Sequence, residues 1–480
     1  MPHINTPQSR CRFGISREDI TPPVGIYHRM WGAATHERAT GIHRPLTATV
    51  AALQSARPGD EGELLLIALD HCLFLAREMD QFLDRVVSAA AVPRAALIVA
   101  FSHTHGAGLM DTDRALLPGG ELIGPYLETL AATVSRMVRA AQQGVQPAAI
   151  VYGYGRCGLA GQRDFADAAT GQWVCGFNPA ATADDTLLVA RVTDDRGAPL
   201  ATFVNYACHP TTLAFENTLI SPDFPGAMRE VIERQTGAPC VFLQGASGDL
   251  GPREGYVGGT QVADRNGRQL GFAALAALEP LPPPQTRFEY AGPVVSGATL
   301  GIWKHVPLSS EERTRGELWR CRQWTVPLRY RPGLSSVDEL QAERLRHLES
   351  KETALRQGDS LAARDAHALI ERVDRQLRRL ASLPPGDEFP LPVCLWQMGD
   401  ALWLAVEGEH YQFLQQALRR RFPDLPLTVI TLANGSRPAY LPTAGIYDTG
   451  MYQETIALLA RGSLERLVDA IDRQICEWMA

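Results

Sequence analysis

The stretch Ala96-Leu-Ile-Val-Ala-Phe-Ser-His-Thr-His-Gly-Ala-Gly108 combines a short apolar run with two histidines and a glycine-rich end. The run from Ala96 to Phe101 predicts a buried strand, and residues two apart on a strand lie on the same face. His103 and His105 are therefore expected to leave the sheet together. Neutral imidazole is a common metal ligand, so the pair indicates a metal site, with two hydrogen-bonded histidines at a loop mouth as the alternative.

Similar apolar runs alternate with helical patterns on both sides of this stretch. Strands are predicted at residues 64–69, 148–154, 187–192, 201–207 and 241–244, and helices around residues 79–87, 126–145 and 273–278. Such alternation is typical of an α/β fold. We therefore expect a mixed β-sheet core with helices on both faces.

The composition changes between about residues 309 and 385, where charged helical patterns replace the apolar runs. Ser336-Val-Asp-Glu339 has the form of a helix capping box. Further along lies a narrow apolar stripe made of Leu369, Val373, Leu377 and Leu380. These features predict an inserted helical hairpin within a single domain that spans residues 1–480. Its role stays open between a structural buttress, a lid and a dimerisation element.

The composition also excludes several classes of function. The chain has 480 residues, 45% of them hydrophobic, and a net charge of −7. Nucleic-acid binding requires a basic surface, so we expect no nucleic-acid partner. No apolar run approaches the roughly 20 residues of a transmembrane segment, and the first residues lack the pattern of a signal peptide. The nine scattered cysteines indicate a reducing compartment, and we expect a cytoplasmic protein.

Other polar residues follow apolar runs in the same way. His209 follows the run at 201–207, and Glu409 follows Trp403–Val406. Because ligands collect beyond strand ends in open α/β sheets, we expect these two residues to converge with His103 and His105. Two histidines and a carboxylate with an open position are what a hydrolytic zinc requires. Taken singly, His209 is more typical of a core histidine than of a ligand, and a helix start is the alternative for Glu409.

The ordered motifs resemble the catalytic domain of the neutral/alkaline non-lysosomal ceramidases. The resemblance covers nearly the whole chain and rests on these motifs: Ile20-Thr-Pro-Pro, Gly41-Ile-His-Arg, Ser102-His-Thr-His-Gly-Ala-Gly, Asn205-Tyr-Ala-Cys-His-Pro-Thr, Gln244-Gly-Ala-Ser-Gly-Asp-Leu-Gly-Pro, Gly408-Glu, Ala433-Asn-Gly and Tyr452-Gln-Glu.

This resemblance implies a zinc-dependent hydrolase of N-acyl amide bonds with one Zn²⁺ per chain. By position in the motifs, it implies that His103, His209, Glu409 and Tyr440 are the zinc ligands. It further implies that His105, Arg163 and Tyr452 surround the activated water and the substrate carbonyl. For the last group, packing tyrosines and an Arg163–Asp164 surface pair are the alternatives.

The chain also departs from the family at two positions. Gly251 stands where the family has a serine proposed to assist catalysis, which excludes a serine nucleophile there. Ser247 aligns with a different position, so it is not expected to replace that serine. Glu407 stands where the family has a proline, either adding a charge near the metal or facing solvent.

The expected mechanism uses a zinc-bound water with a pKa near ~7, which attacks the amide carbonyl. His105 is the expected general acid, since its ordinary pKa lies near neutrality. Tyr452 is expected to stabilise the charge on the carbonyl oxygen. Asp223 is expected either to orient a ligand imidazole or to cap a helix.

The expected substrate is a soluble small-molecule amide, because the sequence shows neither an export signal nor the extra C-terminal β-domain of the secreted lipid-cleaving enzymes. Lactone or cyclic-amide opening and ceramide hydrolysis are the alternatives within enzymes. A catalytically silent metal-binding module is the alternative outside them. The oligomeric state stays open, with a homo-oligomer among the outcomes.

Overall fold

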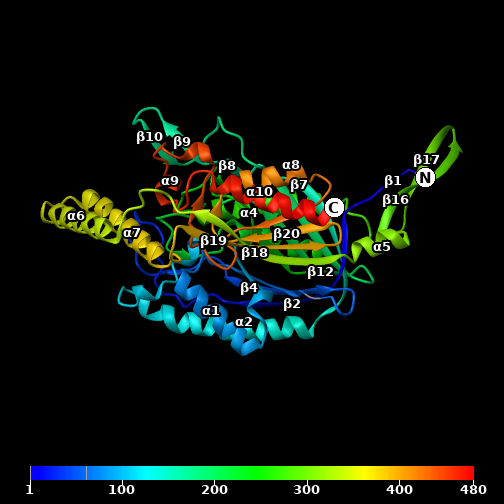
Figure 1. Ribbon diagram of the computed structural model, residues 1–480, viewed down its shortest axis with the longest axis horizontal. Helices are drawn as coiled ribbons and strands as arrows, with labels where there is room; N and C mark the ends of the chain where they lie inside the picture. The colour runs from blue at the N-terminus through cyan, green and yellow to red at the C-terminus, as the bar shows by residue number, and fades with distance from the viewer. Residues whose placement is uncertain (1, 61) are drawn as a thin grey trace.

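A computed structural model describes residues 2–60 and 62–480. Two β-sheets pack face to face, and helices cover the outer face of each sheet (Figure 1). The α/β class is confirmed, and helices do lie on both outer faces. The difference from the expectation is that two sheets, rather than one, stand between them.

The larger sheet has eight strands and is mixed. Its outermost pairs, β14–β12 and β5–β6, are parallel, and the pairs between them are antiparallel. In spatial order its strands are β14 (Cys240–Gln244), β12 (Pro199–Tyr206), β11 (Thr186–Asp194), β7 (Gln146–Arg156), β2 (Gln8–Asp19), β4 (Thr47–Ser55), β5 (Leu64–Leu69) and β6 (Leu97–Phe101).

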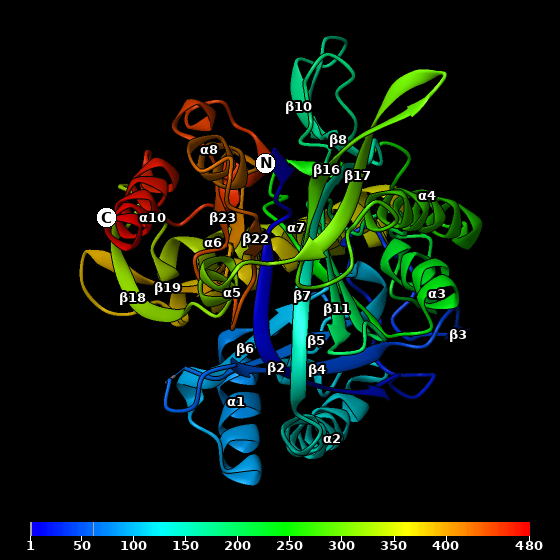
Figure 2. The same cartoon turned by 90° about the vertical axis from the view of Figure 1, so that its right-hand side faces the viewer.

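Four helices cover the outer face of this sheet: α1 (Ala76–Ala90), α2 (Ile123–Gln143), α3 (Phe224–Thr236) and α4 (Thr260–Leu278). In α1 the apolar residues Met79, Phe82, Leu83 and Val86 recur at helical spacing and are buried. They pack against the outward side chains of β4, β5 and β6. Figure 2 shows α1 and α2 below the sheet and α3 and α4 beside it.

The smaller sheet has four strands: β18 (Trp319–Arg329), β19 (Glu388–Met398), β20 (Ala401–Val406) and β22 (Leu427–Ile430). Trp396 and Trp403 on its inner face are buried against the larger sheet, where the Trp403 ring meets the edge of Phe203 at 5.1 Å. Its outer face packs on α8 (Phe413–Arg421) and α10 (Ser463–Met479). The large aromatic side chains explain why this sheet pairs with the first instead of facing solvent.

The segment after β22 joins both edges of the larger sheet. Thr431 donates its backbone N–H to Gln244 at the end of β14 (3.0 Å), and Asn434 donates to Val99 in β6 (3.0 Å). The Asn434 side-chain oxygen accepts the Val99 N–H at 2.7 Å in return. These bonds bring together the ends of strands that are far apart in the sheet order.

The predicted hairpin consists of α6 (Val337–Arg356) and α7 (Ser360–Ala381). It is inserted between the paired strands β18 and β19 and projects from one end of the molecule (Figure 1). The Ser336–Glu339 capping box is present in both directions. The helical region is shorter than expected, because residues 309–330 contain the short helix α5 (Ser310–Gly316) and strand β18.

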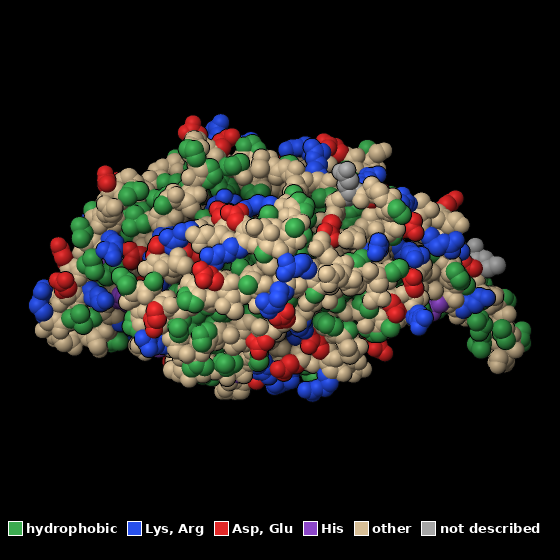
Figure 3. Space-filling model, turned by 90° about the horizontal axis from the view of Figure 1, so that it is seen from below, with side chains coloured by type: hydrophobic (Ala, Val, Ile, Leu, Met, Phe, Trp, Pro, Cys, Tyr) green, Lys and Arg blue, Asp and Glu red, His purple; other side chains and the backbone are tan. Residues whose placement is uncertain are grey.

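At the opposite end, β16 (Thr286–Ser296) and β17 (Ala298–Pro307) form a projecting β-hairpin. Figure 3 shows apolar side chains at this end, whereas charged side chains of both signs are scattered over the rest of that face. Val295, with 83% of its surface exposed, lies near the tip. Among the described residues, no helix has the length and apolar character needed to cross a membrane.

Candidate metal centre

The two histidines of the opening motif lie just beyond β6. The strand ends at Phe101, His103 adopts a left-handed backbone with φ of +65°, and His105 opens a short 3₁₀ turn. The expectation that both leave one face of a strand was therefore wrong in its local geometry. The turn packs against Ser221, whose carbonyl accepts a hydrogen bond from the Thr104 hydroxyl at 2.7 Å. The imidazole rings nevertheless lie together, with centroids 5.0 Å apart.

His103, His209 and Glu409 converge as expected. His209 follows β12, and Glu409 lies in β21 (Glu409–His410), just after β20. Glu409 Oε2 lies 3.0 Å from His209 Nε2 and 3.4 Å from His103 Nε2. The three ligand atoms are all within 4.8 Å of one another, and all three residues are buried.

Backbone carbonyls fix the orientation of both imidazoles. His103 Nδ1 lies 2.8 Å from the carbonyl of Cys72, and His209 Nδ1 lies 2.7 Å from that of Ser247. A carbonyl only accepts, so each Nδ1 carries the hydrogen and each neutral Nε2 presents its lone pair. Two lone pairs and a carboxylate oxygen then face one another in a buried space. Such a donor set fits a divalent cation, which removes their mutual repulsion.

The electrostatics of His209 and Glu409 agree with this arrangement. Burial, together with the charge of Arg163, lowers the pKa of His209 to about 4, which leaves the imidazole neutral. Burial alone would raise the pKa of Glu409, but the adjacent His103 and His209 imidazoles hold it well below its usual range. Glu409 is therefore an anionic ligand atom at neutral pH.

A second donor set, Cys72, His103 and His105, also lies within 4.8 Å. In this set Cys72 Sγ faces His103 Nδ1 at 3.5 Å. That nitrogen already donates to the Cys72 carbonyl, whereas Nε2 of His103 has no hydrogen-bond partner among the described residues. The His103–His209–Glu409 set therefore fits a cation better.

Tyr440 and Arg163 lie against this set. Tyr440 lies in the short strand β23 (Tyr440–Leu441), which pairs with β21 so that Tyr440 stands opposite Glu409. Its ring stacks near that of His209, with centroids 6.4 Å apart. Arg163 is 4% exposed and donates to the Tyr440 hydroxyl at 3.1 Å and to the Gly248 carbonyl at 2.6 Å. The alternative Arg163–Asp164 surface pair is not formed, since Asp164 accepts from Tyr411 and Gln453 instead.

His105 and Tyr452 line the cavity that leads to these residues. Burial lowers the pKa of His105 well below its usual range. His105 is thus neutral at neutral pH, so it has to take up a proton before it can act as the expected general acid. Tyr452 opens the short helix α9 (Tyr452–Ile456), is 44% exposed and contacts the Tyr440 ring at 5.9 Å.

The structure gives Asp223 the helix-capping role. Its carboxylate accepts the backbone N–H of Phe224 (2.6 Å) at the start of α3 and that of Leu213 (2.9 Å). The imidazoles of His103 and His209 are held by backbone carbonyls instead. Burial raises the pKa of Asp223 to about 6.

The positions that depart from the family also have clear placements. Glu407 neither faces solvent nor adds a charge at the metal ligands, because it is buried in a two-pronged ion pair with Arg437 (2.9 and 3.0 Å). Ser247 lies behind His209, with its hydroxyl 3.2 Å from Nδ1, on the ring edge opposite to Glu409. Gly251, in β15 (Leu250–Pro252), lies beside Thr211 and Arg163.

The sequence matches no family model and no curated protein. Two solved structures do match over 98% of this chain. The crystal structure of neutral ceramidase from Pseudomonas aeruginosa aligns over 74% of its own chain with a TM-score of 0.62 and 16% identity. A ceramidase complexed with C2 aligns over 74% of its chain with a TM-score of 0.61 and 16% identity. The fold is similar to that of the neutral ceramidases. At this identity the likeness concerns the fold alone.

In this ceramidase-like fold, a cavity of about 340 Å³ opens beside the metal ligands, and a smaller one of about 70 Å³ reaches His103 and Glu409. Sequence reasoning missed several of its lining residues. Trp31 packs on the His105 ring at 5.1 Å, and Tyr256 meets the Trp31 edge at 5.8 Å. Arg375 and Arg379 of α7 line both cavities. The one feature of the sequence that could have indicated these lining residues was the spacing of the arginines along the predicted helix.

Proposed function

We propose that this chain is a zinc-dependent hydrolase of amide bonds. The observation that carries the proposal is the donor set of His103, His209 and Glu409, whose lone pairs meet in a buried space at the end of a cavity. Two imidazoles and one carboxylate, with a position left open, are the ligands of many hydrolytic zinc sites. Similarity of fold to the ceramidases supports an amide as the bond that is cleaved.

Tyr440 is the fourth ligand in this proposal. Burial and the nearby Glu409 carboxylate raise the pKa of its hydroxyl well above the usual value. A cation beside Glu409 opposes that effect, because it neutralises the carboxylate charge. When bound, zinc supplies an acidified water and polarises the acyl carbonyl.

The surrounding residues bind the substrate and transfer the proton. His105 is neutral and its Nε2 has no hydrogen-bond partner among the described residues, so it can take a proton and pass it to the leaving nitrogen. Arg163 holds the Tyr440 hydroxyl, which fixes that ligand before substrate enters. Tyr452, half-exposed at the cavity, can donate its hydroxyl to the substrate carbonyl.

The test combines metal analysis with turnover. Purified protein should contain one zinc per chain, lose activity on N-acyl amides when a chelator removes the metal, and regain it when zinc is restored. A panel that includes lactones and cyclic amides identifies the bond that is cleaved. Full zinc occupancy without turnover of any panel member would support a silent metal-binding module and refute the proposal.

A further inference from the structure

One face of α7 forms a wall of the cavity. Ala368, Arg372, Arg375 and Arg379 line the larger cavity, and Arg375 and Arg379 also line the smaller one. Their spacing of four, three and four residues places them on a single helical stripe. The inserted hairpin therefore brings a row of guanidinium groups to the side of the proposed metal centre.

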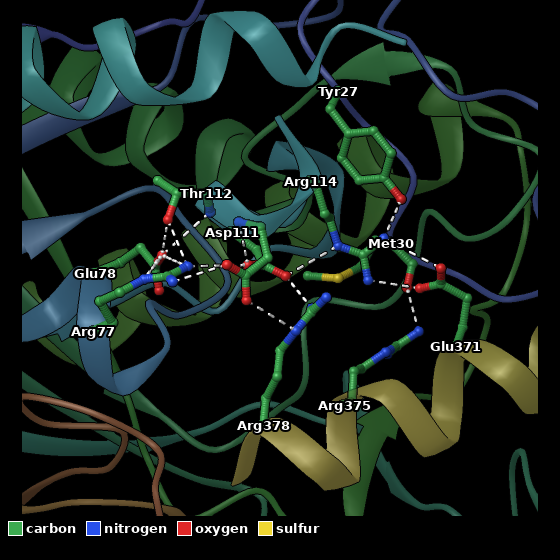
Figure 4. Close-up of polar contacts among 11 residues, drawn as sticks. Tyr27, Met30, Arg77, Glu78, Asp111, Thr112, Arg114, Glu371, Arg375 and Arg378 are labelled. Atoms are coloured by element: carbon green, nitrogen blue, oxygen red, sulfur yellow. Dashed lines mark hydrogen bonds and ion pairs between the residues drawn. The ribbon is translucent and has the colours of Figure 1, made fainter. Parts of the chain in front are cut away.

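Residues on an adjacent stripe of α7 attach this helix to the body of the protein. Glu371 accepts from Arg114 at 2.6 Å, and Arg378 donates to the buried Asp111 (Figure 4). Ala368 also presses against Gly32, since a Cβ added to Gly32 would lie 2.6 Å from the Ala368 Cβ. The contacts hold α7 in one position, so the arginines on its cavity face are presented in a defined place.

Two of these arginines are not engaged in ion pairs. Neither Arg375 nor Arg379 forms an ion pair with any carboxylate in residues 2–60 and 62–480. Arg375 Nε is buried without a hydrogen-bond partner in this part of the chain, and one terminal nitrogen makes a long contact of 3.4 Å to the Met30 carbonyl. Burial lowers the pKa of Arg375, as expected for a cation removed from water without a partner.

The cavities otherwise offer little negative charge. Glu409 is the one carboxylate among their described lining residues, and it belongs to the proposed metal centre. Arg372 is already paired with Glu343 at 3.3 Å, and Arg163 with Tyr440 and a carbonyl. Arg375 and Arg379 are thus the cations left to bind a ligand that enters from outside.

We propose that Arg375 and Arg379 form a carboxylate-binding subsite, and that the substrate is an amide carrying a carboxylate beside the scissile bond. This inference rests on the proposed function. Two planar guanidinium groups match a carboxylate in charge and shape. Met30, Trp31 and Ile456 line the rest of the larger cavity, which suits an apolar side chain. An N-acylated amino acid with an apolar side chain combines these features.

The first test measures binding without the metal, so that it does not depend on turnover. Calorimetry on chelator-treated protein compares N-acetylleucine with N-acetylleucinamide, which differs only in lacking the negative charge. We expect the acid to bind at least about tenfold more tightly than the amide. Arg375→Gln and Arg379→Gln should each remove most of that preference. Arg364→Gln is the matched control, because Arg364 lies on α7 outside the cavities and its guanidinium is paired with its neighbour Asp365.

The second test measures acetate release by the zinc-loaded protein from the same two compounds. The Arg375→Gln and Arg379→Gln variants should lose about 10- to 100-fold in kcat/KM for the acid and little for the amide, while Arg375→Lys retains part of the preference. Equal binding of acid and amide by the metal-free wild type would overturn the subsite. Absence of any turnover with the binding preference intact would refute the proposed hydrolase and leave the subsite standing.

Discussion

At the scale of single residues, the metal centre is defined by which nitrogen of each histidine is free. The sequence predicted that His103, His209 and Glu409 converge, because each follows an apolar run that ends at the same edge. It did not predict the orienting partners, since these are the carbonyls of Cys72 and Ser247, and every residue has a carbonyl. Hydrogen bonds to backbone groups therefore cannot be predicted from the residue types in a sequence.

His103→Ala should abolish zinc retention and activity together. Removal of a direct ligand should cost more than the roughly 10- to 100-fold loss of affinity that follows removal of an outer hydrogen-bond partner. Elemental analysis of purified protein measures the zinc content. The control is His347→Ala, a histidine on α6 that lies 3.4 Å from Glu343 and outside the donor set. Full zinc occupancy in the His103 variant would refute the assignment.

Ser247→Ala should keep its activity within about tenfold of the wild type, because a water is the proposed nucleophile. The Ser247 hydroxyl lies on the Nδ1 edge of His209, where carbonyls still hold the ring after the change. Steady-state kinetics and mass spectrometry of quenched reactions check this expectation. An acyl group trapped on Ser247 would contradict it.

Gly251→Ser, which introduces a hydroxyl beside Arg163, should be tolerated. A Cβ at this position would have Thr211 Oγ1 at 3.8 Å and Arg163 Cδ at 3.9 Å as its nearest neighbours, which is ordinary contact. The new hydroxyl can also bond the Thr211 hydroxyl, which is buried without a partner among the described residues. We expect the free energy of unfolding to change by less than about 1 kcal/mol.

Gly248→Ser is the matched contrast to this substitution. There a Cβ would lie 2.9 Å from the backbone of Glu409 and His410, which cannot move away without displacing the metal ligand. Chemical denaturation should show a loss of at least about 1–3 kcal/mol for Gly248→Ser. Equal stability of the two variants would contradict the expectation that a side chain fits at Gly251 and not at Gly248.

At the scale of elements, the inserted hairpin is a fixed wall of the cavity. The sequence predicted both helices from their capping box and apolar stripe, but left their role open. Their attachment depends on pairs such as Arg114–Glu371 and Asp111–Arg378, which are 257 and 267 residues apart in the chain. Charged residues on a helix are typical of a solvated face, so the sequence alone gave no reason to bury these.

Glu371→Ala should loosen the hairpin, because it leaves the Arg114 guanidinium buried without its main partner. Loss of one member of a buried ion pair costs about 3–5 kcal/mol. Hydrogen exchange should therefore rise across residues 337–381, with weaker binding of carboxylate ligands. Glu352→Ala, which removes only an exposed pair with Arg356 on α6, should change stability by less than about 1 kcal/mol.

The Arg114–Glu371 pair also predicts how the stability of the hairpin changes with pH. Burial alone would raise the pKa of Glu371, but the hydrogen bond and charge of Arg114 hold it below its ordinary 4.5. The contribution of this pair to stability is therefore complete above pH 4.5 and is lost as the pH falls through the lower folded-state value. Exchange measured as a function of pH should show the hairpin loosening on the acid side in the wild type. An unchanged acid profile in Glu371→Ala relative to wild type would contradict this assignment.

At the scale of the whole molecule, the fold class followed from the alternation of strands and helices, but the number of sheets did not. The run Trp403–Val406 in β20 was recognised, and nothing in its periodicity says which sheet it joins. That choice depends on the packing of Trp396 and Trp403 against the larger sheet. Long-range packing of this kind is decided by the shape of both partners.

The complete cavity predicts that short N-acyl amino acids are hydrolysed faster than long-chain ceramide. A ceramide has no negative charge for Arg375 and Arg379, so it would leave both guanidinium groups without an ion-pair partner and Arg375 Nε buried without a hydrogen bond. Initial rates at equal concentrations, with ceramide presented in detergent micelles, give the comparison. Faster hydrolysis of ceramide, with no small acid cleaved, would contradict the prediction.

The position of the hairpin separates the proposed chemistry of this protein from its proposed selectivity. The proposed zinc ligands follow strands of the two sheets, whereas the arginine wall belongs to a segment inserted between β18 and β19, whose pairing stays in register across the insertion. Such a segment can be exchanged in evolution, or by grafting, without moving the ligands. A hairpin with neutral residues in place of Arg375 and Arg379 would thus convert this scaffold to uncharged amides while its hydrolytic centre stays unchanged.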